Sequence, residues 1–416
     1  MSFVISDVQI FDGEAVVTKN GAVLVEDGLI KAIGEDLAAR YPHLETISKP
    51  GHTLLPGLID AHCHPYGESS LPEQAFRFGI TTIMDLQNEH HQAVRQKQWA
   101  KERKDFPDVK SSHHAATIAG GWPEWFERRY NNNPEAKWDN WPNVANIDDA
   151  EPFIERAVRD GADYIKLFHE GGAATDIQGL VQPREEVQAA VVAAARRQSL
   201  KVIAHALARQ DTIEVLRAGV DGMAHSFYDK PINPEIIAAY KTNNAWLNPT
   251  LAAVGSLTGE ANDLLKSFST DPRVVSRTTL HDMSLLSRCM HMSCKGAKWE
   301  YAIDSVRQLK AAGFDIICGS DAARGAPSVV FGATFHLELH LLVEKAGLLP
   351  VEALRAATGV TAKRFGWNDR GRIQPGLKAD LLLVEGDPVT DITELLNIRE
   401  IWRDGVRFEG HPGFAK

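Results

Sequence analysis

The chain has 416 residues, of which 44% are hydrophobic and 24% charged, and its formal net charge is −10. The acidic balance, with no cluster of lysine and arginine to offset it, argues against a nucleic-acid partner, and the lack of any apolar run of about 18 residues argues against a membrane-spanning helix. The four cysteines show no CxxC spacing, and the first residues lack the basic start and apolar core of a secretory signal. We therefore expect a cytoplasmic protein with a small-molecule substrate.

Short strands are predicted at both ends of the chain. Apolar and polar residues alternate in segments such as FVISDVQIF near the N-terminus and IREIWRDGVRF near the C-terminus, as they do in strands with one buried face. Because chain termini often lie close together, we expect residues 1–53 and 365–416 to combine into one small β-sandwich. The sandwich would lie beside a central domain formed by residues 54–364.

The central domain has a different sequence pattern, in which apolar strands alternate with helical segments such as PREEVQAAVVAAARRQ at 183–198. Eight candidate strands occur, at residues 54–62, 80–86, 109–117, 162–168, 200–206, 220–226, 244–250 and 313–319. Alternation of this kind predicts an α/β fold with a parallel sheet, and eight units predict a closed (β/α)₈ TIM barrel. A doubly wound open sheet is the alternative, which the absence of a GxGxxG motif after any strand disfavours.

Histidines stand at the ends of three predicted strands. His62 and His64 are two residues apart, so they share one face of the chain and can bind one ion; a hydrogen-bonded pair in a polar loop is the alternative. His205 and His225 end neighbouring strands, which lie about 4.8 Å apart in a parallel sheet, although either alone would more often be structural. Together the four favour a metal site at the face where a barrel builds its active site.

An aspartate and a lysine end two further strands. Asp321 follows the last strand, which a closed barrel places beside the first, and its carboxylate can bind a metal ion and carry a proton; a helix N-cap is the alternative. The ammonium of Lys166 cannot ligate a cation. Near metal ions its pKa would fall, and the free amine can react with carbon dioxide to give a bridging carbamate. An ion pair with Glu170 explains Lys166 equally well from the residues alone.

Two long insertions, residues 120–150 and 251–300, follow predicted strands and should lie over the active face. The first contains Trp122, Trp125, Trp138 and Trp141. These tryptophans form either an aromatic lid for a ring-bearing substrate or the packing of the insertion onto the barrel, and the sequence favours neither.

Other candidate substrate contacts lie near strand ends. They are Asn248 and Thr250 at the end of strand 244–250, Tyr228 and Arg324 just past candidate ligands, and His113 and His114 near the third strand. Arg324 could hold a substrate carboxylate with two parallel hydrogen bonds. Cys63 alternates to the face opposite its histidine neighbours, which indicates a core residue and not a nucleophile.

On these residues the chain resembles the amidohydrolase superfamily. LPGLIDAHCH resembles the strand-1 motif of that superfamily, IQPGLKADLLLVEGDPV its C-terminal return into the sandwich, and HLELHLLVEKAGLLPVEALRAAT the helices after strand 8. The lysine of YIKLF, followed by Gly171 and Gly172, resembles the subgroup of Xaa-Pro dipeptidases, ochratoxinase and imidazolonepropionase-like proteins.

The resemblance implies two divalent ions, commonly zinc, bridged by an N6-carboxylated lysine. It implies these ligands: His62, His64 and Asp321 for one ion, His205 and His225 for the other, and Lys166 between them. We therefore predict a binuclear metal-dependent hydrolase that cleaves an amide bond through a hydroxide shared by the ions, with Asp321 as the catalytic proton carrier. The expected substrates are N-acyl amino acids, dipeptides or aromatic amides. The resemblance also implies that the protein can form a homo-oligomer, since barrels of this superfamily often associate.

Two departures bear on the substrate. Trp122 and Leu207 stand where relatives often have histidines that face substrate, which suggests a more apolar substrate than a typical dipeptide. A lactone or ester hydrolase with the same centre remains an alternative. A mononuclear deaminase is disfavoured by Ala208, where such enzymes carry a glutamate, and by the presence of Lys166. No sequence feature specifically indicates a metal-dependent decarboxylase. A non-enzymatic scaffold would be expected to lose metal ligands, whereas this chain retains all of them.

Overall fold

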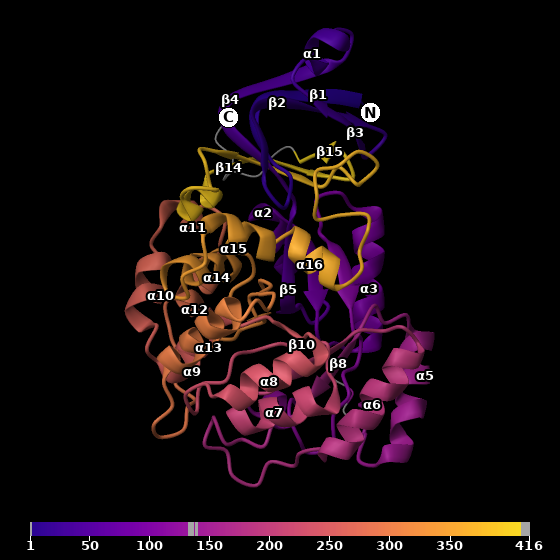
Figure 1. The fold of residues 1–416 in the computed structure, drawn as a ribbon, viewed down its shortest axis with the longest axis vertical. Helices are drawn as coiled ribbons and strands as arrows, with labels where there is room; N and C mark the ends of the chain where they lie inside the picture. Colours follow the sequence, from indigo (N-terminus) through magenta and orange to yellow (C-terminus); the bar gives the residue numbers. More distant parts are fainter. Residues whose placement is uncertain (1, 132–136, 138–139, 409–416) are drawn as a thin grey trace.

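The computed structural model describes residues 2–131, 137 and 140–408. Strands from both ends of the chain form one seven-stranded sheet in the order β15-β14-β13-β4-β1-β2-β3, seen as the upper layer in Figure 1. Its strands are β1 (Ser2–Phe11), β2 (Val16–Glu26), β3 (Leu29–Gly34), β4 (Glu45–Pro56), β13 (Leu381–Glu385), β14 (Ile398–Arg403) and β15 (Val406–Arg407).

The two ends combine as the sequence predicts, but within the described residues they form a single hydrogen-bonded sheet and not two stacked ones. β1 pairs in parallel with β4, and β13 adds the C-terminal strands by pairing antiparallel with β4. Side chains on both faces of β1 are buried, with Phe3 and Ile5 in one apolar cluster and Val4 in another. The alternating pattern that predicted a sandwich therefore belongs to one sheet with a core on each face.

The central strands form two four-stranded parallel sheets, in the orders β12-β5-β6-β7 and β11-β10-β9-β8. Their strands are β5 (Leu58–His64), β6 (Ile80–Asp85), β7 (Asp108–Ser111), β8 (Ile165–Phe168), β9 (Val202–His205), β10 (Gly222–Met223), β11 (Trp246–Leu247) and β12 (Ala322–Ala323). Seven of them match predicted strands, whereas residues 313–319 contribute an isolated bridge at Ile316 in place of a regular eighth strand.

Backbone hydrogen bonds link the two sheets at both of their edges. At one seam Ala116 N donates to Lys166 O at 2.8 Å and Phe168 N to Ala116 O at 3.0 Å. At the other, Ile317 N donates to Leu247 O at 2.9 Å and Ala61 N to Cys318 O at 3.0 Å. Residues 315–318 thus stand between β11 and β5, which is the connection that a ring of eight strands requires.

Helices lie on the outside of these strands (Figure 1). Those between β5 and β11 are α2 (Ser70–Arg77), α3 (His90–Glu102), α4 (Glu124–Phe126), α5 (Ala150–Asp160), α6 (Glu185–Arg197), α7 (Arg209–Ala218) and α8 (Pro234–Asn243). Those after β11 are α9 (Leu251–Thr258), α10 (Asn262–Phe268), α11 (Pro272–Val275), α12 (Leu280–Leu286), α13 (Trp299–Ala311), α14 (Ala333–Glu344), α15 (Pro350–Ala356) and α16 (Gly359–Arg364). Short elements are α1 (Leu37–Arg40), the π-helical turn η1 (Glu127–Asn131), and the 3₁₀ turns η3 (Ile147–Asp149) and η4 (Ile392–Leu396).

The sequence of α6 shows why such helices form where they do. Glu185 and Glu186 lie in its first turn and Arg196 and Arg197 in its last, which complements the helix dipole at both ends. On its buried face, Val187, Val191, Val192, Ala194 and Ala195 join the large cluster between helices and strands. None of the helices in the described part of the chain combines the length and the apolar composition that a membrane-spanning segment needs.

A separate apolar cluster is shared by the two four-stranded sheets. It takes residues from both four-stranded sheets and from the 315–318 segment: Ala61, Met84, Leu86, Tyr164, Ile203, Ala224, Trp246 and Ile317. Phe365 and Trp367, which follow α16, pack against this cluster. The strands are thus held in register by a packed interior, and their carboxyl ends are left free to carry polar side chains.

Candidate metal centre

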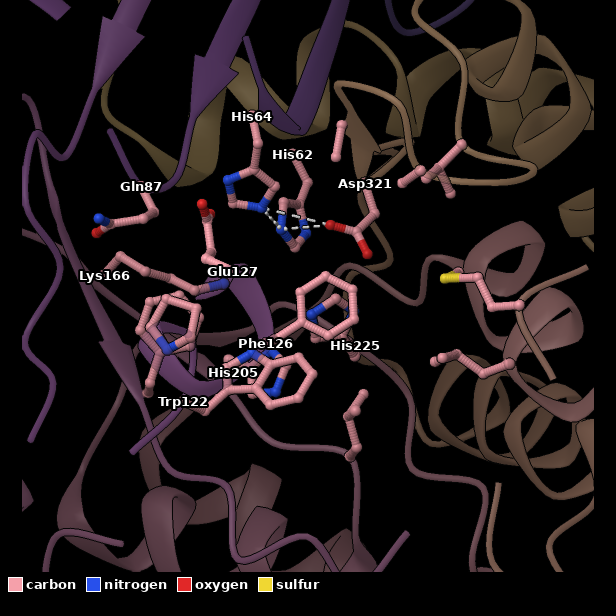
Figure 2. Close-up of a pocket in the computed structure, with 18 of the residues that line it drawn as sticks. His62, His64, Gln87, Trp122, Phe126, Glu127, Lys166, His205, His225 and Asp321 are labelled. Carbon is pink, nitrogen blue, oxygen red and sulfur yellow. Dashed lines mark hydrogen bonds and ion pairs between the residues drawn. The ribbon is translucent and has the colours of Figure 1, made fainter. Parts of the chain in front are cut away.

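A pocket opens at the carboxyl ends of the central strands, with about 740 Å³ of empty space when its open mouth is included. Its lining includes all six predicted metal ligands: His62, His64, Lys166, His205, His225 and Asp321. Figure 2 shows their side chains turned toward one another, with His62 and His64 both coming from β5. The structure therefore brings together residues that span 260 positions of the sequence, from His62 to Asp321, counting both.

His62, His64 and Asp321 form the closest group. Asp321 Oδ1 lies 3.1 Å from His62 Nε2 and 3.4 Å from His64 Nε2, and the two Nε2 atoms are 3.2 Å apart. Asp321 adopts a left-handed backbone with φ 57°, while its amide donates to the carbonyl of His62 at 2.8 Å. An uncommon conformation held by a hydrogen bond to the neighbouring strand aims the carboxylate at both imidazoles.

His225 extends this group toward His205. Potential ligand atoms of His62, His225 and Asp321 all lie within 4.8 Å of one another, and the ring centroids of His205 and His225 are 4.7 Å apart. His62 Nδ1 donates to Ala224 O at 3.2 Å, and His225 Nδ1 contacts Thr250 Oγ1 at 2.8 Å. Partners on Nδ1 leave the Nε2 lone pairs of these two rings directed into the pocket.

Burial sets the charge state of these side chains. It lowers the pKa of His62, His205 and His225 well below the usual value, and the charge of Lys166 acts in the same direction on all three. Burial by itself would raise the pKa of Asp321, but the hydrogen bond from His64 and the charge of His225 keep it below its usual value. The site therefore offers neutral imidazoles and an ionised carboxylate, which are the protonation states that bind metal ions.

Lys166 is fully buried, and its Nζ has no hydrogen-bond partner among the described residues. Burial lowers its pKa to about 7, against the opposing effect of the Asp321 charge. Glu170, the alternative partner considered from sequence, instead accepts hydrogen bonds from the amides of Gly172 and Leu207, at 2.8 and 3.1 Å. An unpaired amine in this position is unfavourable unless something else binds it.

A buried framework beneath the pocket fixes the strand ends. Asp60 accepts hydrogen bonds from the Ser320 amide at 2.9 Å and the Ser320 hydroxyl at 2.6 Å, which joins β5 to the segment that carries Asp321. A Cβ at Gly319 would lie 2.4 Å from Asn248 Nδ2 and 2.7 Å from the backbone nitrogen of His62. Only glycine therefore allows the two segments to approach this closely.

The predicted substrate contacts divide into two groups. Trp122 lines the pocket, whereas His113, Tyr228, Asn248, Thr250 and Arg324 do not. Arg324 pairs with Glu68 at 2.7 Å, and Tyr228 donates to the carbonyl of Met292 at 3.4 Å. Asn248 lies beneath His62 and donates to Ala61 O at 3.3 Å. These side chains support the walls of the site and do not face its interior.

The remaining predicted residues near the third strand lie further away. His113 Nδ1 contacts His90 Nδ1 at 3.1 Å, and burial lowers the pKa of His113 to about 3. His114 Nε2 lies 3.2 Å from Glu89 Oε2. Cys63 is fully buried and its thiol points to the carbonyl of Met84, as expected for a core residue.

The tryptophans of the insertion have separate roles. Trp122 stacks on His205, with ring centroids 5.4 Å apart and planes inclined by 21°. Trp125 stacks with Arg129, and Trp141 Nε1 donates to Glu89 at 2.6 Å. Trp138 lies outside the described residues. Within the described part of the insertion, one tryptophan faces the pocket and two pack the segment, so both interpretations of the sequence apply.

Sequence reasoning missed several lining residues, among them Tyr66, Gln87, Phe126 and Glu127. Tyr66 donates to Glu127 Oε1 at 2.5 Å. Tyr66 follows the two histidines of β5, and Glu127 is a carboxylate within the aromatic segment WPEWFE. Those positions were the available signals, but neither residue ends a strand, so periodicity did not identify them.

A second group of potential metal ligands, His169, Asp211 and Glu214, lies outside the pocket. His169 Nε2 contacts Glu214 Oε2 at 2.8 Å, and Asp211 accepts a hydrogen bond from the Gly171 amide at 3.1 Å. These bonds tie the loop after β8 to α7. The group is therefore accounted for by protein contacts, unlike the strand-end cluster with its unpaired amine.

The model of the Amidohydrolase family matches residues 53–407. Ochratoxinase from Aspergillus niger is 23% identical over 451 residues, covering 97% of this chain and 85% of that protein. Among solved structures, a Xaa-Pro dipeptidase with bound methionine superposes with a TM-score of 0.76 at 21% identity, covering 99% of this chain and 100% of that chain. A. niger ochratoxinase superposes with a TM-score of 0.74 at 19% identity, covering 99% and 98%.

Proposed function

This chain belongs to the amidohydrolase family and is a hydrolase of carbon–nitrogen bonds, and on that premise we propose that it is a binuclear metal enzyme which cleaves an amide bond. The observation that carries the proposal is Lys166, whose buried Nζ has no hydrogen-bond partner among the described residues although it lies in a pocket lined by four imidazoles. The proposal takes the two four-stranded sheets as the halves of one (β/α)₈ barrel with the site at its mouth.

The donor set fits two divalent ions. His62, His64 and Asp321 would hold one ion, His205 and His225 the other, and a carboxylated Lys166 would bridge them. Nitrogen and oxygen donors of this kind suit zinc, and also manganese, cobalt or iron. When bound, such ions polarise a carbonyl oxygen and lower the pKa of a water molecule.

The side chains of the chain then have distinct tasks. Lys166 supplies a neutral amine, which adds carbon dioxide and releases a proton to become an anionic carbamate. Asp321 orients the attacking water, accepts its proton and passes that proton to the leaving nitrogen. Trp122, Phe126 and Leu257 provide apolar walls that exclude bulk water from the reacting groups.

The proposed substrates are N-acyl amino acids, dipeptides and aromatic amides. Two similar proteins, an ochratoxinase and a Xaa-Pro dipeptidase, support a search in this range. The apolar lining around Trp122, in place of a polar histidine, favours the aromatic amides among them. Esters and lactones pass through the same kind of tetrahedral intermediate, so they belong in the same screen.

The test combines metal analysis with a hydrolysis screen of N-acyl amino acids, Xaa-Pro dipeptides, aromatic amides and lactones on one sample. We expect about two ions per chain and turnover of at least one amide. In Asp321→Asn, which keeps an oxygen ligand but no base, we expect metal to remain and kcat to fall by about 10²–10⁴-fold. Near one ion per chain, or turnover by the variant close to that of the unmodified protein, would contradict the proposal.

A further inference from the structure

Glu127 places a carboxylate in the wall of the pocket, and this carboxylate is not one of the proposed metal ligands. It begins the π-helical turn η1, and its amide donates to Pro123 O at 2.9 Å. The side chain is 2% exposed and lines the pocket. Figure 2 shows its carboxylate near the His64 ring, on the side of the pocket opposite Asp321.

The two oxygens of this carboxylate differ. Oε1 accepts a hydrogen bond from the Tyr66 hydroxyl at 2.5 Å, whereas Oε2 is buried and has no hydrogen-bond partner among the described residues. A buried acceptor without a partner is rare in folded proteins. Burial raises the pKa of Glu127, and the Tyr66 hydrogen bond opposes that rise. One oxygen is thus fixed by the protein, and the other is left without a partner on a residue that lines the pocket.

Most of the remaining lining is apolar, and includes Trp122, Phe126, Leu257, Met290 and Val329. Gln87 and Tyr66 are the other polar side chains outside the proposed metal ligands; Gln87 Oε1 accepts from the Ala115 amide at 2.6 Å, and the Tyr66 hydroxyl donates to Glu127. No arginine lines the pocket in the described residues, and Lys166 is its only lysine. Arg324, the candidate for binding a substrate carboxylate, is 42% exposed in its side chain and turned to Glu68. Beyond the proposed metal ligands, Glu127 is therefore the one carboxyl group that lines the pocket in the described residues.

We propose that Glu127 selects substrates carrying a protonated amine on an apolar, ring-bearing acyl group, and that it does so by accepting an N–H hydrogen bond at Oε2. The amine would lie on the acyl side of the scissile amide, as in an aminoacyl arylamide. A substrate with a carboxylate in that position would meet a like charge in an apolar wall, which costs binding energy. This inference rests on the proposed amide hydrolysis and adds the substrate class to it.

Kinetics on matched anilides tests the inference. Phenylalanine 4-nitroanilide carries the amine, N-acetylphenylalanine 4-nitroanilide removes its charge, and the N-succinyl derivative replaces it by a carboxylate. We expect kcat/KM to fall in that order, by about tenfold or more at the first step, because charge-assisted hydrogen bonds are about twice as strong as neutral ones. Equal values for the amine and acetyl substrates would overturn the proposal.

Glu127→Gln is the decisive variant, since the amide keeps an oxygen for Tyr66 and replaces Oε2 by an NH₂ group. We expect the amine preference to fall to near one through a higher KM for the amine substrate, with metal content unchanged. Glu124→Gln is the matched control, because Glu124 lies in the same segment, does not line the pocket and bonds to Arg128 and the Gly120 amide; it should keep the preference. Loss of metal in Glu127→Gln would identify Glu127 as a ligand and overturn the proposal.

A binding measurement separates this inference from the proposed reaction. Calorimetry with the metal-loaded protein compares 2-phenylethylamine with the uncharged 2-phenylethanol. We expect the amine to bind about tenfold or more tightly, and the difference to disappear in Glu127→Gln. That result supports the inference even if no anilide is hydrolysed, in which case only the proposed reaction fails. Equal binding of the two compounds would overturn the inference whatever the enzyme hydrolyses.

Discussion

Two walls of the pocket are built differently. On one wall the side chains stand at the ends of parallel strands, and their orientations are fixed by hydrogen bonds such as His62 to Ala224 O and Asp321 N to His62 O. The other wall comes from residues 121–131, where α4 spans three residues and η1 five. Its pocket-facing side chains, such as Trp122 and Phe126, are carried by short turns.

The difference suggests a division of labour. Strand ends hold groups within a few tenths of an ångström, as chemistry with metal ions requires, whereas loops can vary in sequence without disturbing the core. We therefore assign the reaction to the strand-end wall and the choice of substrate to the loop wall. Substitutions on the first wall should change metal content or kcat, and substitutions on the second should change substrate preference alone.

The largest effect is expected for Lys166→Met, which removes the amine from the strand-end wall but keeps most of its apolar volume. Without a bridging anion we expect metal content to fall and hydrolysis to become undetectable, while circular dichroism stays that of the unmodified protein. Lys201→Met is the control, because that lysine is 46% exposed in its side chain and pairs with Asp221.

Carbon-13 bicarbonate sharpens this prediction. We expect a carbamate resonance in the unmodified protein that is missing in Lys166→Met. The lowered pKa, about 7, means that the neutral, CO₂-reactive amine predominates above that pH, so reloading of metal-free protein should slow as the pH falls below 7. Full metal content in Lys166→Met would contradict the proposal that a carboxylated Lys166 bridges the two ions.

The strand-end wall is also the part that the sequence predicts best. Apolar runs locate the strands, parallel pairing brings their ends together, and His62, His205, His225 and Asp321 follow from position alone. The breaks in the prediction have local causes. The predicted eighth strand does not form a regular hydrogen-bond ladder, because its backbone bonds go to different segments. Asp315 and Ile317 bond to Leu247, whereas Cys318 donates to Ala356 O and accepts from the Ala61 amide.

The loop wall could not be derived in the same way. The side chains of Trp122 and Trp125 are three residues apart, yet one stacks on His205 and the other on Arg129, and no sequence period distinguishes them. Glu127 depends on a tertiary contact with Tyr66, 61 residues away. Thr250 was predicted to face the cavity, whereas it lies behind His225, because the left-handed backbone at Thr250, with φ 48°, redirects its side chain.

Thr250→Val tests whether the strand-end wall depends on such supporting contacts. Valine has nearly the same shape but cannot bond to His225 Nδ1, so the imidazole loses the partner that fixes its tautomer. We expect metal affinity or kcat/KM to fall by about 10–100-fold, measured by chelator competition and by kinetics. Thr258→Val at the other end of α9 is the control, since its hydroxyl donates to Gly255 O at 3.2 Å and accepts from the Glu260 amide at 3.4 Å, and Thr258 does not line the pocket. If both variants bind metal with equal affinity, the Thr250 hydrogen bond does not orient His225, and packing alone holds the ring.

The smallest effect is expected on the loop wall, for Trp122→Leu. Leucine keeps the wall apolar but removes a ring that stacks on His205 and lines the pocket. A substrate ring would lose its aromatic partner, and such a pair contributes about 0.5–1.5 kcal/mol beyond its buried area. We therefore expect kcat/KM for aromatic amides to fall by about 2–12-fold, with metal content unchanged and aliphatic amides little affected. Trp125→Leu, which alters a ring outside the pocket lining, should leave both substrate classes unchanged. Loss of metal in Trp122→Leu would mean that the loop wall helps to hold the metal ions through its contact with His205. The proposed separation of metal binding from substrate choice would then be wrong.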